Sequence, residues 1–294
     1  MRILHLTDTH LGAEMYALGP PGWSREQDHV AAMRAALLPA IQGLVDLVVH
    51  SGDLFNRSRP SPRAMAAASG LLREAARRVP VLVMPGNHDR RGLQRSLPMR
   101  CPGLSVVDQP SAFEHGGVRL GVLPFLRDPL RWAREARDLD AQILVAHQAF
   151  DGARVPGLVF RVGRQGDTLG EEHMPPRTRW VMCGHIHPRQ LTWVGEAQVV
   201  QPGSTERTSF SEADQSKGYA IWELGREVRW RFVDLPTRPM ARVSCAADLH
   251  CLEPGTLVHT TLEPAPLLRR GLHVCPRRGP HVRPSSSPQP ALFA

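Results

Sequence analysis

Pro85-Gly86-Asn87-His88-Asp89 is the stretch of this sequence that decides the fold. It follows Val81-Leu82-Val83-Met84, an apolar run next to prolines that is typical of a buried strand. The amide of Asn87 and the imidazole of His88 are therefore expected on a loop at the end of a strand. Taken alone, so short a motif carries little weight, because turn residues and structural histidines explain it at least as well.

Four other apolar runs end in the same way, at residues 3–6, 47–49, 143–146 and 180–183. The polar residues that follow them are Asp8, His10, Asp53, His147, His185 and His187. Open α/β sheets place their sites outside the carboxyl ends of the strands, so we expect these side chains to share one site. The ordered set of segments predicts an α/β fold with a functional site at this edge.

These residue types are suited to divalent cations. Manganese, iron and zinc accept carboxylate oxygen, amide oxygen and imidazole nitrogen, and one carboxylate with two oxygens can bridge a pair of ions. The set contains no pair of cysteines, which argues against a closed structural zinc site. Two adjacent ions would polarise a phosphoryl group and activate water. The sequence thus indicates a two-metal site for phosphate-ester chemistry.

In this order, the motifs DxH, GD, GNHD, H and GHxH resemble those of the calcineurin-like metallophosphoesterase superfamily over about residues 1–235. Three further stretches resemble its DNA-repair nuclease branch, of the SbcD/Mre type. They are ILHLTDTHLG at 3–12, GDLFNRSRPSP at 52–62, and QPGSTERTSF at 201–210 followed by Lys217-Gly218-Tyr219. The resemblance implies a four-layer α/β sandwich, in which two mixed β-sheets are flanked by helices.

Carried over position by position, the resemblance implies two metal ions that share Asp53. One ion would be held by Asp8, His10, Asp53 and His187. The other would be held by Asp53, Asn87, His147 and His185. Manganese (Mn2+) is the expected metal, with Mg2+, Fe2+ and Zn2+ as alternatives.

His88 is the residue expected to catalyse without binding metal. An imidazolium there would stabilise developing charge or protonate the leaving oxygen, and Asp89 is expected to orient it. Asn56 stands where many family members carry a second catalytic histidine, and it cannot shuttle a proton at neutral pH. The balance between exonuclease and endonuclease activity therefore stays open. Substrate contacts are expected from Asn56, Arg59, Arg90 and Arg189.

Two helices are expected after the first two metal-ligand segments, between Trp23 and Gly43 and from Ser61 to Arg78. Ser24 and Gln27 have the spacing of a capping box, and Pro62 suits the first turn of the second helix. In the family, helices in these positions pair across a dimer axis. The pattern alone is explained by two helices that cover the sheet, so a homodimer is implied by the resemblance only.

We divide the chain into a nuclease domain, residues 1–235, and a C-terminal region, residues 236–294. The C-terminal region begins like the junction to the family's capping domain and continues rich in Pro, Arg and His, without a sustained amphipathic helix. We expect a truncated or degenerate cap that is poorly structured, with a disordered tail. A coiled-coil ATPase of the SbcC/Rad type is the family's partner at such a C-terminus, and the shortness of this one argues against it.

Composition sets further limits. No apolar run approaches 18 residues, and the first residues enter a strand without a basic and apolar leader, so we expect a cytoplasmic protein without a membrane partner. The net charge is +8, but residues 236–294 carry seven Arg against three acidic residues, which is +4. Half of the excess thus lies in a fifth of the chain. Charge supports DNA as a partner only weakly.

The expected function is that of a two-metal-dependent DNA nuclease in repair or recombination, an exonuclease with endonuclease activity as a further option. The first alternative is a metallophosphoesterase that acts on a small phosphate ester or cyclic nucleotide; the stretches around Arg59 and Glu206 argue against it. The second is a DNA-binding subunit without turnover, against which the presence of all seven ligand residues argues.

Overall fold

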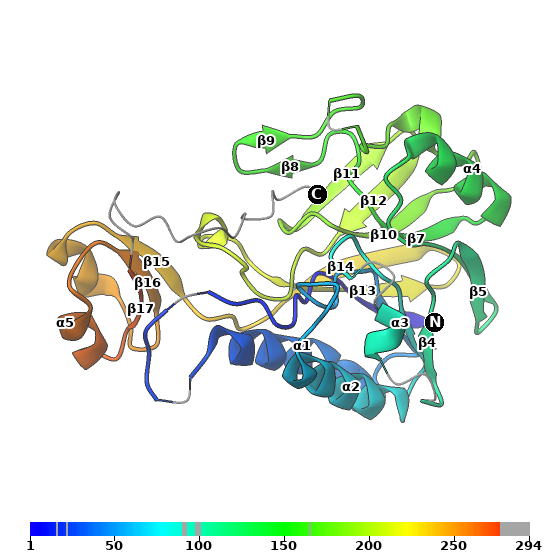
Figure 1. Cartoon of the computed structure of the whole chain (residues 1–294). Helices are drawn as coiled ribbons and strands as arrows, with labels where there is room; N and C mark the ends of the chain where they lie inside the picture. The colour runs from blue at the N-terminus through cyan, green and yellow to red at the C-terminus, as the bar shows by residue number, and fades with distance from the viewer. Residues whose placement is uncertain (16, 22, 90–92, 98–100, 165, 277–294) are drawn as a thin grey trace.

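The computed structural model describes all residues except 16, 22, 90–92, 98–100, 165 and 277–294. Two six-stranded sheets face each other, and helices cover their outer faces (Figure 1). In the first sheet, β1 to β4 are parallel and β13 runs antiparallel to both of its neighbours. Its order is β14 (Val228–Asp234), β13 (Gly218–Leu224), β1 (Arg2–Leu6), β2 (Leu47–His50), β3 (Val81–Val83) and β4 (Leu104–Val106).

The second sheet is also mixed. Its inner strands β12, β10, β7 and β6 are parallel, whereas the edge strands β11 and β5 are antiparallel to their neighbours. Its order is β11 (Gln190–Val194), β12 (Ala197–Gln201), β10 (Trp180–Gly184), β7 (Ile143–His147), β6 (Val118–Leu123) and β5 (Ser111–His115).

Helices flank both sheets. The α-helices are α1 (Arg25–Ile41), α2 (Pro62–Ala76), α3 (Leu93–Ser96), α4 (Pro129–Leu139) and α5 (Pro264–Arg269), and the 3₁₀ helices are η2 (Glu171–His173), η3 (Phe210–Glu212) and η4 (Ala246–Cys251). One half of the expected capping box is present, because the side chain of Gln27 accepts from Ser24 N–H at 3.3 Å, whereas Ser24 Oγ has no partner among the described atoms. At the start of α2, Pro62 lies in the first turn as expected, and Ser61 Oγ accepts from Ala64 N–H at 3.1 Å. Both predicted helices are confirmed.

Within the described part of the chain, no helix is both long enough and apolar enough to cross a bilayer.

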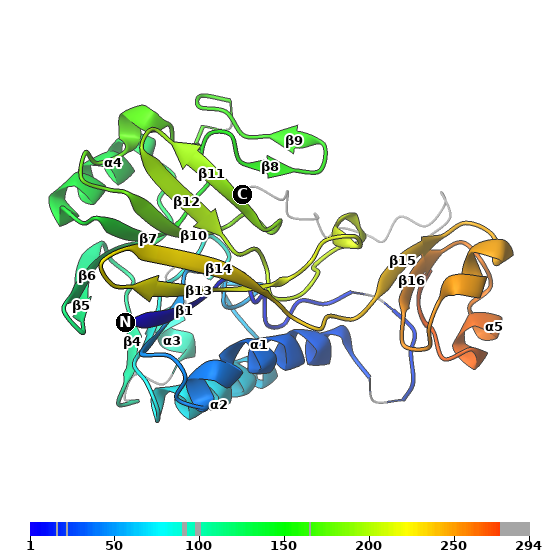
Figure 2. The ribbon, with the colours of Figure 1, turned by 180° about the vertical axis from the view of Figure 1, so that it is seen from behind.

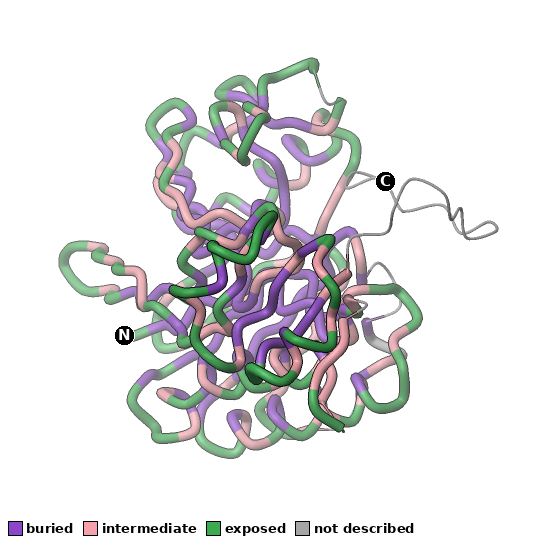
Figure 3. Tube along the Cα trace, turned by 90° about the vertical axis from the view of Figure 1, so that its left-hand side faces the viewer, coloured by how far each residue is buried: buried purple, intermediate pink, exposed green. Residues whose placement is uncertain are grey.

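Three apolar cores separate the layers. Leu4 and Leu6 of β1 pack towards α1 and α2, whereas Ile3 of the same strand lies in the core between the two sheets. Trp132 of α4 packs with Leu144 of β7 on the outer face of the second sheet. Figure 3 shows the buried residues gathered in the middle of the molecule. The order helix, sheet, sheet, helix confirms the predicted four-layer sandwich.

Two stretches outside the main apolar runs contain short strands. Residues 92–110 contain β4, and residues 150–179 contain the hairpin of β8 (Arg154–Val155) and β9 (Leu158–Val159). These strands have two or three residues, and none of their residues is fully buried. Strands so short and so exposed leave no apolar period in the sequence.

The C-terminal region differs from expectation in its described part. Residues 240–276 form a parallel sheet of β15 (Met240–Val243), β16 (Leu257–Thr260) and β17 (His273–Pro276), covered by α5 and η4. This unit has a core of its own, which includes Val258, Leu267 and Val274. Four-residue strands separated by irregular segments gave too weak a pattern to predict it. The expected disordered tail, 277–294, lies outside the described residues, and the division at residue 235 stays a prediction.

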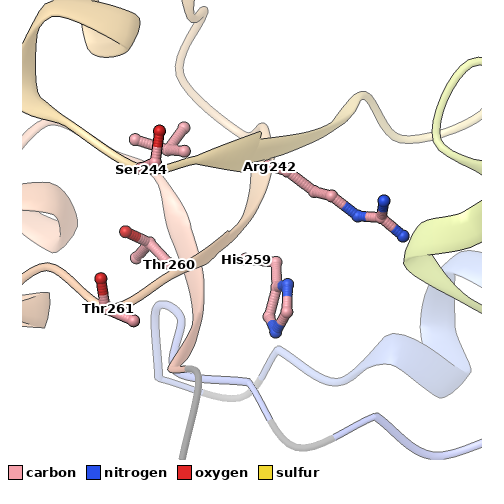
Figure 4. Close-up of a pocket in the computed structure, with 6 residues that line it drawn as sticks. Arg242, Ser244, His259, Thr260 and Thr261 are labelled. Carbon is pink, nitrogen blue, oxygen red and sulfur yellow. The ribbon is translucent and has the colours of Figure 1, made fainter.

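The C-terminal unit lies at one end of the sandwich in both ribbon views (Figures 1 and 2). The loop before α1 is paired with it through Leu18 and Val274, whose backbones exchange hydrogen bonds of 2.6 and 2.7 Å. Phe210 of η3 stacks on His259 of β16, with ring centroids 5.0 Å apart. Figure 4 shows Arg242 of β15 extending towards the segment that contains η3.

One ion pair joins the C-terminal unit to α1. Arg238, in the linker before β15, donates to both carboxylate oxygens of Asp28 at 2.7 Å and to the carbonyl oxygen of Gly255 at 2.7 Å. Its guanidinium also lies over the ring of Trp23, 5.2 Å from the centroid. Both charged side chains are mostly buried, and Asp28 is compensated by Arg238 together with Arg25, whose Nη1 lies 2.8 Å from the same carboxylate.

Replacing Arg238 with Ala is expected to loosen the C-terminal unit. Loss of the pair leaves Asp28 partly buried with fewer donors, which should lower the free energy of undocking by about 2 kcal/mol. The rate of cleavage in the linker should then rise about 30-fold. Limited proteolysis with an unspecific protease would measure cleavage in the linker 235–239. The control is Arg229→Ala, because Arg229 and Glu227 are each about three-quarters exposed. Equal cleavage of both variants would contradict the role of this pair.

Candidate metal centre

All seven predicted ligands lie at the carboxyl ends of strands, at one edge of the two facing sheets. The loops after β1, β2 and β3 come from the first sheet, and those after β7 and β10 come from the second. The first two loops run side by side, with Asp8 N–H donating to Gly52 O at 3.0 Å and His10 N–H donating to Asp53 O at 3.1 Å. The sheets therefore bring together residues that are up to 179 positions apart.

One group of side chains gathers around Asp8. His10 Nε2 lies 3.0 Å from His187 Nε2 and 3.8 Å from Asp8 Oδ1, and His187 Nε2 lies 3.9 Å from the same Asp8 oxygen. Asp53 Oδ2 is 3.8 Å from His10 Nε2. Two imidazole nitrogens and two carboxylates thus point at one small volume, as in a site for a divalent cation.

A second group gathers on the other side of Asp53. His147 Nε2 lies 3.3 Å from Asp53 Oδ2 and 3.1 Å from Asn87 Oδ1. Asn87 Oδ1 is also 2.9 Å from His185 Nδ1. The same Asp53 oxygen faces both groups, so this carboxylate lies between them.

The backbone is strained at these positions. Among the described residues, the non-glycine residues with positive φ are Asp8, His10, Asp53, Asp140 and His185, with values from 45° to 85°. Four of these five are predicted ligands. Such conformations are held only by their surroundings and cluster at functional sites.

Two glycines allow the loops to approach this closely. Gly52 has φ of +104°, and a Cβ there would overlap the ring of His147. A Cβ on Gly86 would overlap the carboxylate of Asp53. The glycines of the GD and GNHD motifs therefore make room for the neighbouring ligand residues.

A hydrogen bond leaves one ring nitrogen of His147 directed at the cluster. His147 Nδ1 bonds to the carbonyl oxygen of Ser51 at 2.8 Å, which places a proton on Nδ1 and leaves Nε2 for the site. Burial acts against protonation, but the Asp53 carboxylate raises the pKa of His147 to about 9. Burial would raise the pKa of Asp53, but His147 and His10 hold it well below its ordinary value. This buried anion is thus matched to positive charge.

The residues fit divalent metal ions. Oxygen and nitrogen donors converge, and the buried Nδ1 of His10 has no hydrogen-bond partner among the described atoms. A buried cluster of this kind is costly unless positive charge compensates its carboxylates. Divalent metal ions are therefore the cofactor class for which these residues are suited.

His88 lies at the wall of the cavity beside this cluster. Its Nδ1 bonds to the carbonyl oxygen of Asn56 at 2.9 Å, so Nδ1 carries a proton and Nε2 is the atom left for substrate. Its ring packs edge-on against His10, with centroids 4.9 Å apart. The cavity has a volume of about 490 Å³, and Asn56 and the β8–β9 hairpin also line it.

Asp89 has a different position from the one expected. Its carboxylate is buried and accepts hydrogen bonds from the backbone N–H groups of Leu54, Phe55 and Gly86 at 2.9, 2.7 and 3.2 Å. Asp89 therefore joins the loop after β3 to the loop after β2. The residue that orients His88 is Asn56, through its carbonyl oxygen.

Two of the three predicted arginine contacts, Arg59 and Arg189, do not line the cavity. Arg189 donates to Asp234 at 2.6 Å and lies over the ring of Phe232, because β14 offers it a carboxylate and an aromatic face. Arg59 is exposed and is absent from the cavity wall. Arg90 lies outside the described residues.

Sequence analysis did not identify Glu212 as a functional residue. Its Oε1 is 2.9 Å from His187 Nδ1 and accepts from Thr208 Oγ1 at 2.7 Å. Its Oε2 is 2.7 Å from Nζ of Lys217, the single lysine of the chain, which is 1% exposed. Burial acts in the opposite direction, but His187 and Lys217 hold the pKa of Glu212 well below its ordinary value. The feature of the sequence that could have indicated a buried acidic partner here is Lys217, the single lysine of the chain, which lies inside a nuclease-like stretch.

The charge of Glu212 is expected to strengthen metal binding by fixing the ring of His187. Glu212→Gln keeps the size of the side chain but removes the charge, and we expect the affinity for Mn2+ to fall about 10- to 100-fold. Titration of free Mn2+ by electron paramagnetic resonance would measure this. Glu196→Gln is the control, since that side chain is 80% exposed. Unchanged affinity in Glu212→Gln would remove Glu212 from the site.

Buried histidines also support the loops from below. His29 of α1 bonds through Nδ1 to the carbonyl oxygen of Thr9 at 3.1 Å, and His5 Nε2 is 2.8 Å from Ser51 Oγ. Burial lowers the pKa of His29 to about 4 and that of His5 to about 3. Both are therefore neutral in the folded protein at neutral pH.

These histidines predict acid sensitivity of the metal-free protein. In the unfolded chain they bind protons below about pH 6.5, whereas the folded protein resists protonation down to about pH 4 for His29. Each should therefore lower stability by up to about 1.4 kcal/mol per pH unit as the pH falls through this window. His29→Asn keeps a donor to Thr9 and should flatten the decline. Urea unfolding in the presence of chelator, from pH 7.5 to 4.5, measures how the free energy of unfolding changes with pH in the wild type and in His29→Asn. Equal slopes for the two proteins would refute the prediction.

Known proteins resemble this chain in sequence and fold. Residues 1–189 match the family model of the calcineurin-like phosphoesterases. The DNA double-strand break repair protein Mre11 of Haloferax volcanii is 32% identical over 249 residues, which cover 82% of this chain and 54% of that protein. Mre11 of Thermoplasma acidophilum is 26% identical over 270 residues, covering 83% and 68% respectively. The chain thus spans about half to two thirds of the length of these relatives.

A solved structure supports the fold alone. A dimetal phosphatase from Danio rerio has a TM-score of 0.51 at 12% identity, with 79% of this chain and 95% of that chain covered. The family match and the Mre11 relatives confirm the resemblance that the motifs indicated. The chain belongs to the calcineurin-like phosphoesterase family and is similar to the Mre11 proteins.

Proposed function

We propose that this protein is a two-metal-dependent nuclease that hydrolyses phosphodiester bonds in DNA during repair or recombination. The observation that carries the proposal is the pair of ligand groups that meet at Asp53 beside an open cavity. The nuclease-like stretches and the similarity to Mre11 favour DNA over a small phosphate ester. Exonuclease activity is the primary expectation, and endonuclease activity is the second.

The two groups would hold two ions, for which Mn2+ is the proposed metal. Asp8, His10 and His187 would serve the first and Asn87, His147 and His185 the second, with Asp53 serving both. When bound, such ions supply Lewis-acid chemistry to a phosphoryl group and to attacking water. His88 would protonate the leaving oxygen from Nε2, while Asn56 O fixes its ring through Nδ1.

The partners are proposed on the family resemblance. DNA is the proposed substrate, and a homodimer through α1 and α2 is consistent with the place of these helices on one outer face (Figure 1). A coiled-coil ATPase of the SbcC/Rad type is a further proposed partner, on the resemblance alone. The cytoplasm is the proposed location.

Nuclease assays on end-labelled single-stranded and double-stranded DNA would test the function, with Mn2+, Mg2+ or chelator. Asp53→Ala should abolish both cleavage and Mn2+ binding. His88→Ala should lower kcat about 10²- to 10⁴-fold, as for loss of a general acid, while Mn2+ binding is retained. Arg229→Ala on the exposed surface of β14 should behave as wild type.

Three outcomes would overturn the proposal. DNA that stays intact with every metal while a small phosphate ester is hydrolysed would identify the first alternative. Binding of DNA without turnover in Mn2+ would identify the second. Retained cleavage in Asp53→Ala would place the chemistry elsewhere.

A further inference from the structure

A second hollow lies next to the candidate metal centre, at the seam between the two sheets. It has a volume of about 400 Å³ and is lined by the loops after β3, β4 and β6 and by the start of α4. Pro85, Pro110 and Pro124 contribute to its apolar wall. Gly86, in the GNHD motif, also lines it, so the loop that carries Asn87 separates this hollow from the metal cavity.

Phe125 connects the two hollows. It lines the second hollow, and its half-buried ring lies 5.7 Å from the ring of His185, with 33° between the planes. The same ring is 6.4 Å from that of His147. Phe125 N–H donates to the carbonyl oxygen of Pro85 at 3.5 Å, which ties the two loops together. An aromatic surface is thus held beside two predicted metal ligands.

The lining of this hollow suits a flat heterocycle. Aromatic side chains bind unpaired bases by stacking, at about 1–3 kcal/mol per base and with little sequence preference. The polar residues that line the hollow are Asp108, Gln109 and Arg131, which offer both acceptors and donors to the edge of a base. In a nucleotide, one sugar separates the phosphate from the base. A phosphate at the metal centre therefore places its base at a distance comparable to the 5.7 Å between the ring centroids of His185 and Phe125.

We propose that this hollow binds one unpaired nucleobase next to the scissile phosphate, with Phe125 as the stacking surface. The inference rests on the proposed nuclease function and adds a substrate class to it. A base in an intact duplex is stacked and paired, and it must leave the helix before it can enter such a pocket. The hollow therefore favours single-stranded DNA and frayed ends over fully paired ends.

Abasic substrates and Phe125 variants together test this inference. A single tetrahydrofuran residue is placed at successive positions of a single-stranded oligonucleotide, and kcat/KM is measured with Mn2+. For the wild type, one position should lower kcat/KM about tenfold. Phe125→Leu, which still fills space against His185, should lose about tenfold on intact DNA and nothing further on that abasic substrate. Phe125→Trp retains an aromatic face and should keep the sensitivity to that abasic position, whereas Leu130→Ala, on the exposed side of α4, should behave as wild type.

A binding measurement gives a readout apart from turnover. The fluorescence of 2-aminopurine at the sensitive position should be quenched by the wild type and by Phe125→Trp but not by Phe125→Leu, with equal Mn2+ affinity in all three. Wild-type cleavage that is insensitive to abasic residues at every position would overturn the inference alone. A further loss of kcat/KM when Phe125→Leu acts on the sensitive abasic substrate would also overturn it, because the base and Phe125 would then act independently. Failure of the wild type to cleave any DNA would overturn the proposed function and the inference with it.

Discussion

The buried carboxylate of Asp53 is the constraint on which the rest of the site depends. One of its oxygens faces both histidine groups, and the other accepts a hydrogen bond from His88 N–H at 2.8 Å. Asp89, one residue further, accepts in return from Leu54 and Phe55, which follow Asp53. The two loops thus exchange carboxylate-to-backbone hydrogen bonds, and the position of Asn87 and His88 follows from this exchange. A carboxylate bonded to several N–H groups is far more rigid than one in solvent.

The meeting of the seven predicted ligands could be anticipated because each lies at or shortly after the end of an apolar strand, where chain order and sheet topology decide which side chains meet. Glu212 follows no strand, and its distance to His187 depends on how the irregular segment from 203 to 217 folds back. Arg189 was misplaced because its partner Asp234 is 45 positions away on a different sheet. The C-terminal unit was missed because its short strands include polar residues such as Arg242 and His259, whereas β2 and β3 are marked by continuous apolar runs. Local patterns predicted what depends on local order, and they did not predict pairings between distant segments.

The stretches that resemble the nuclease branch have a structural role in this chain. Glu206 is buried and pairs with Arg25 of α1 at 2.9 Å. Arg207 donates to the carbonyl oxygens of Glu212 and Gln215, on the segment beside the metal centre, and also to Thr237 Oγ1 in the linker to the C-terminal unit. One guanidinium therefore connects the linker to the segment that supports His187. A motif of this kind sets the position of a neighbouring unit relative to the site, so its presence does not require contact with DNA.

The features that favour function at this site also destabilise the metal-free fold. Positive φ values at four predicted ligand positions, the close carboxylates of Asp8 and Asp53, and a buried His10 Nδ1 without a partner among the described atoms each cost free energy. The three apolar cores of the sandwich offset these costs, because the site loops are anchored on fully buried strands such as β2 and β7. The strand ends are thus where the rigid scaffold fixes the site loops, so that their carboxylates and imidazoles stay close together. Positive charge from bound cations would act on the same carboxylates whose burial is unfavourable, so metal binding and folding stability are coupled through Asp53.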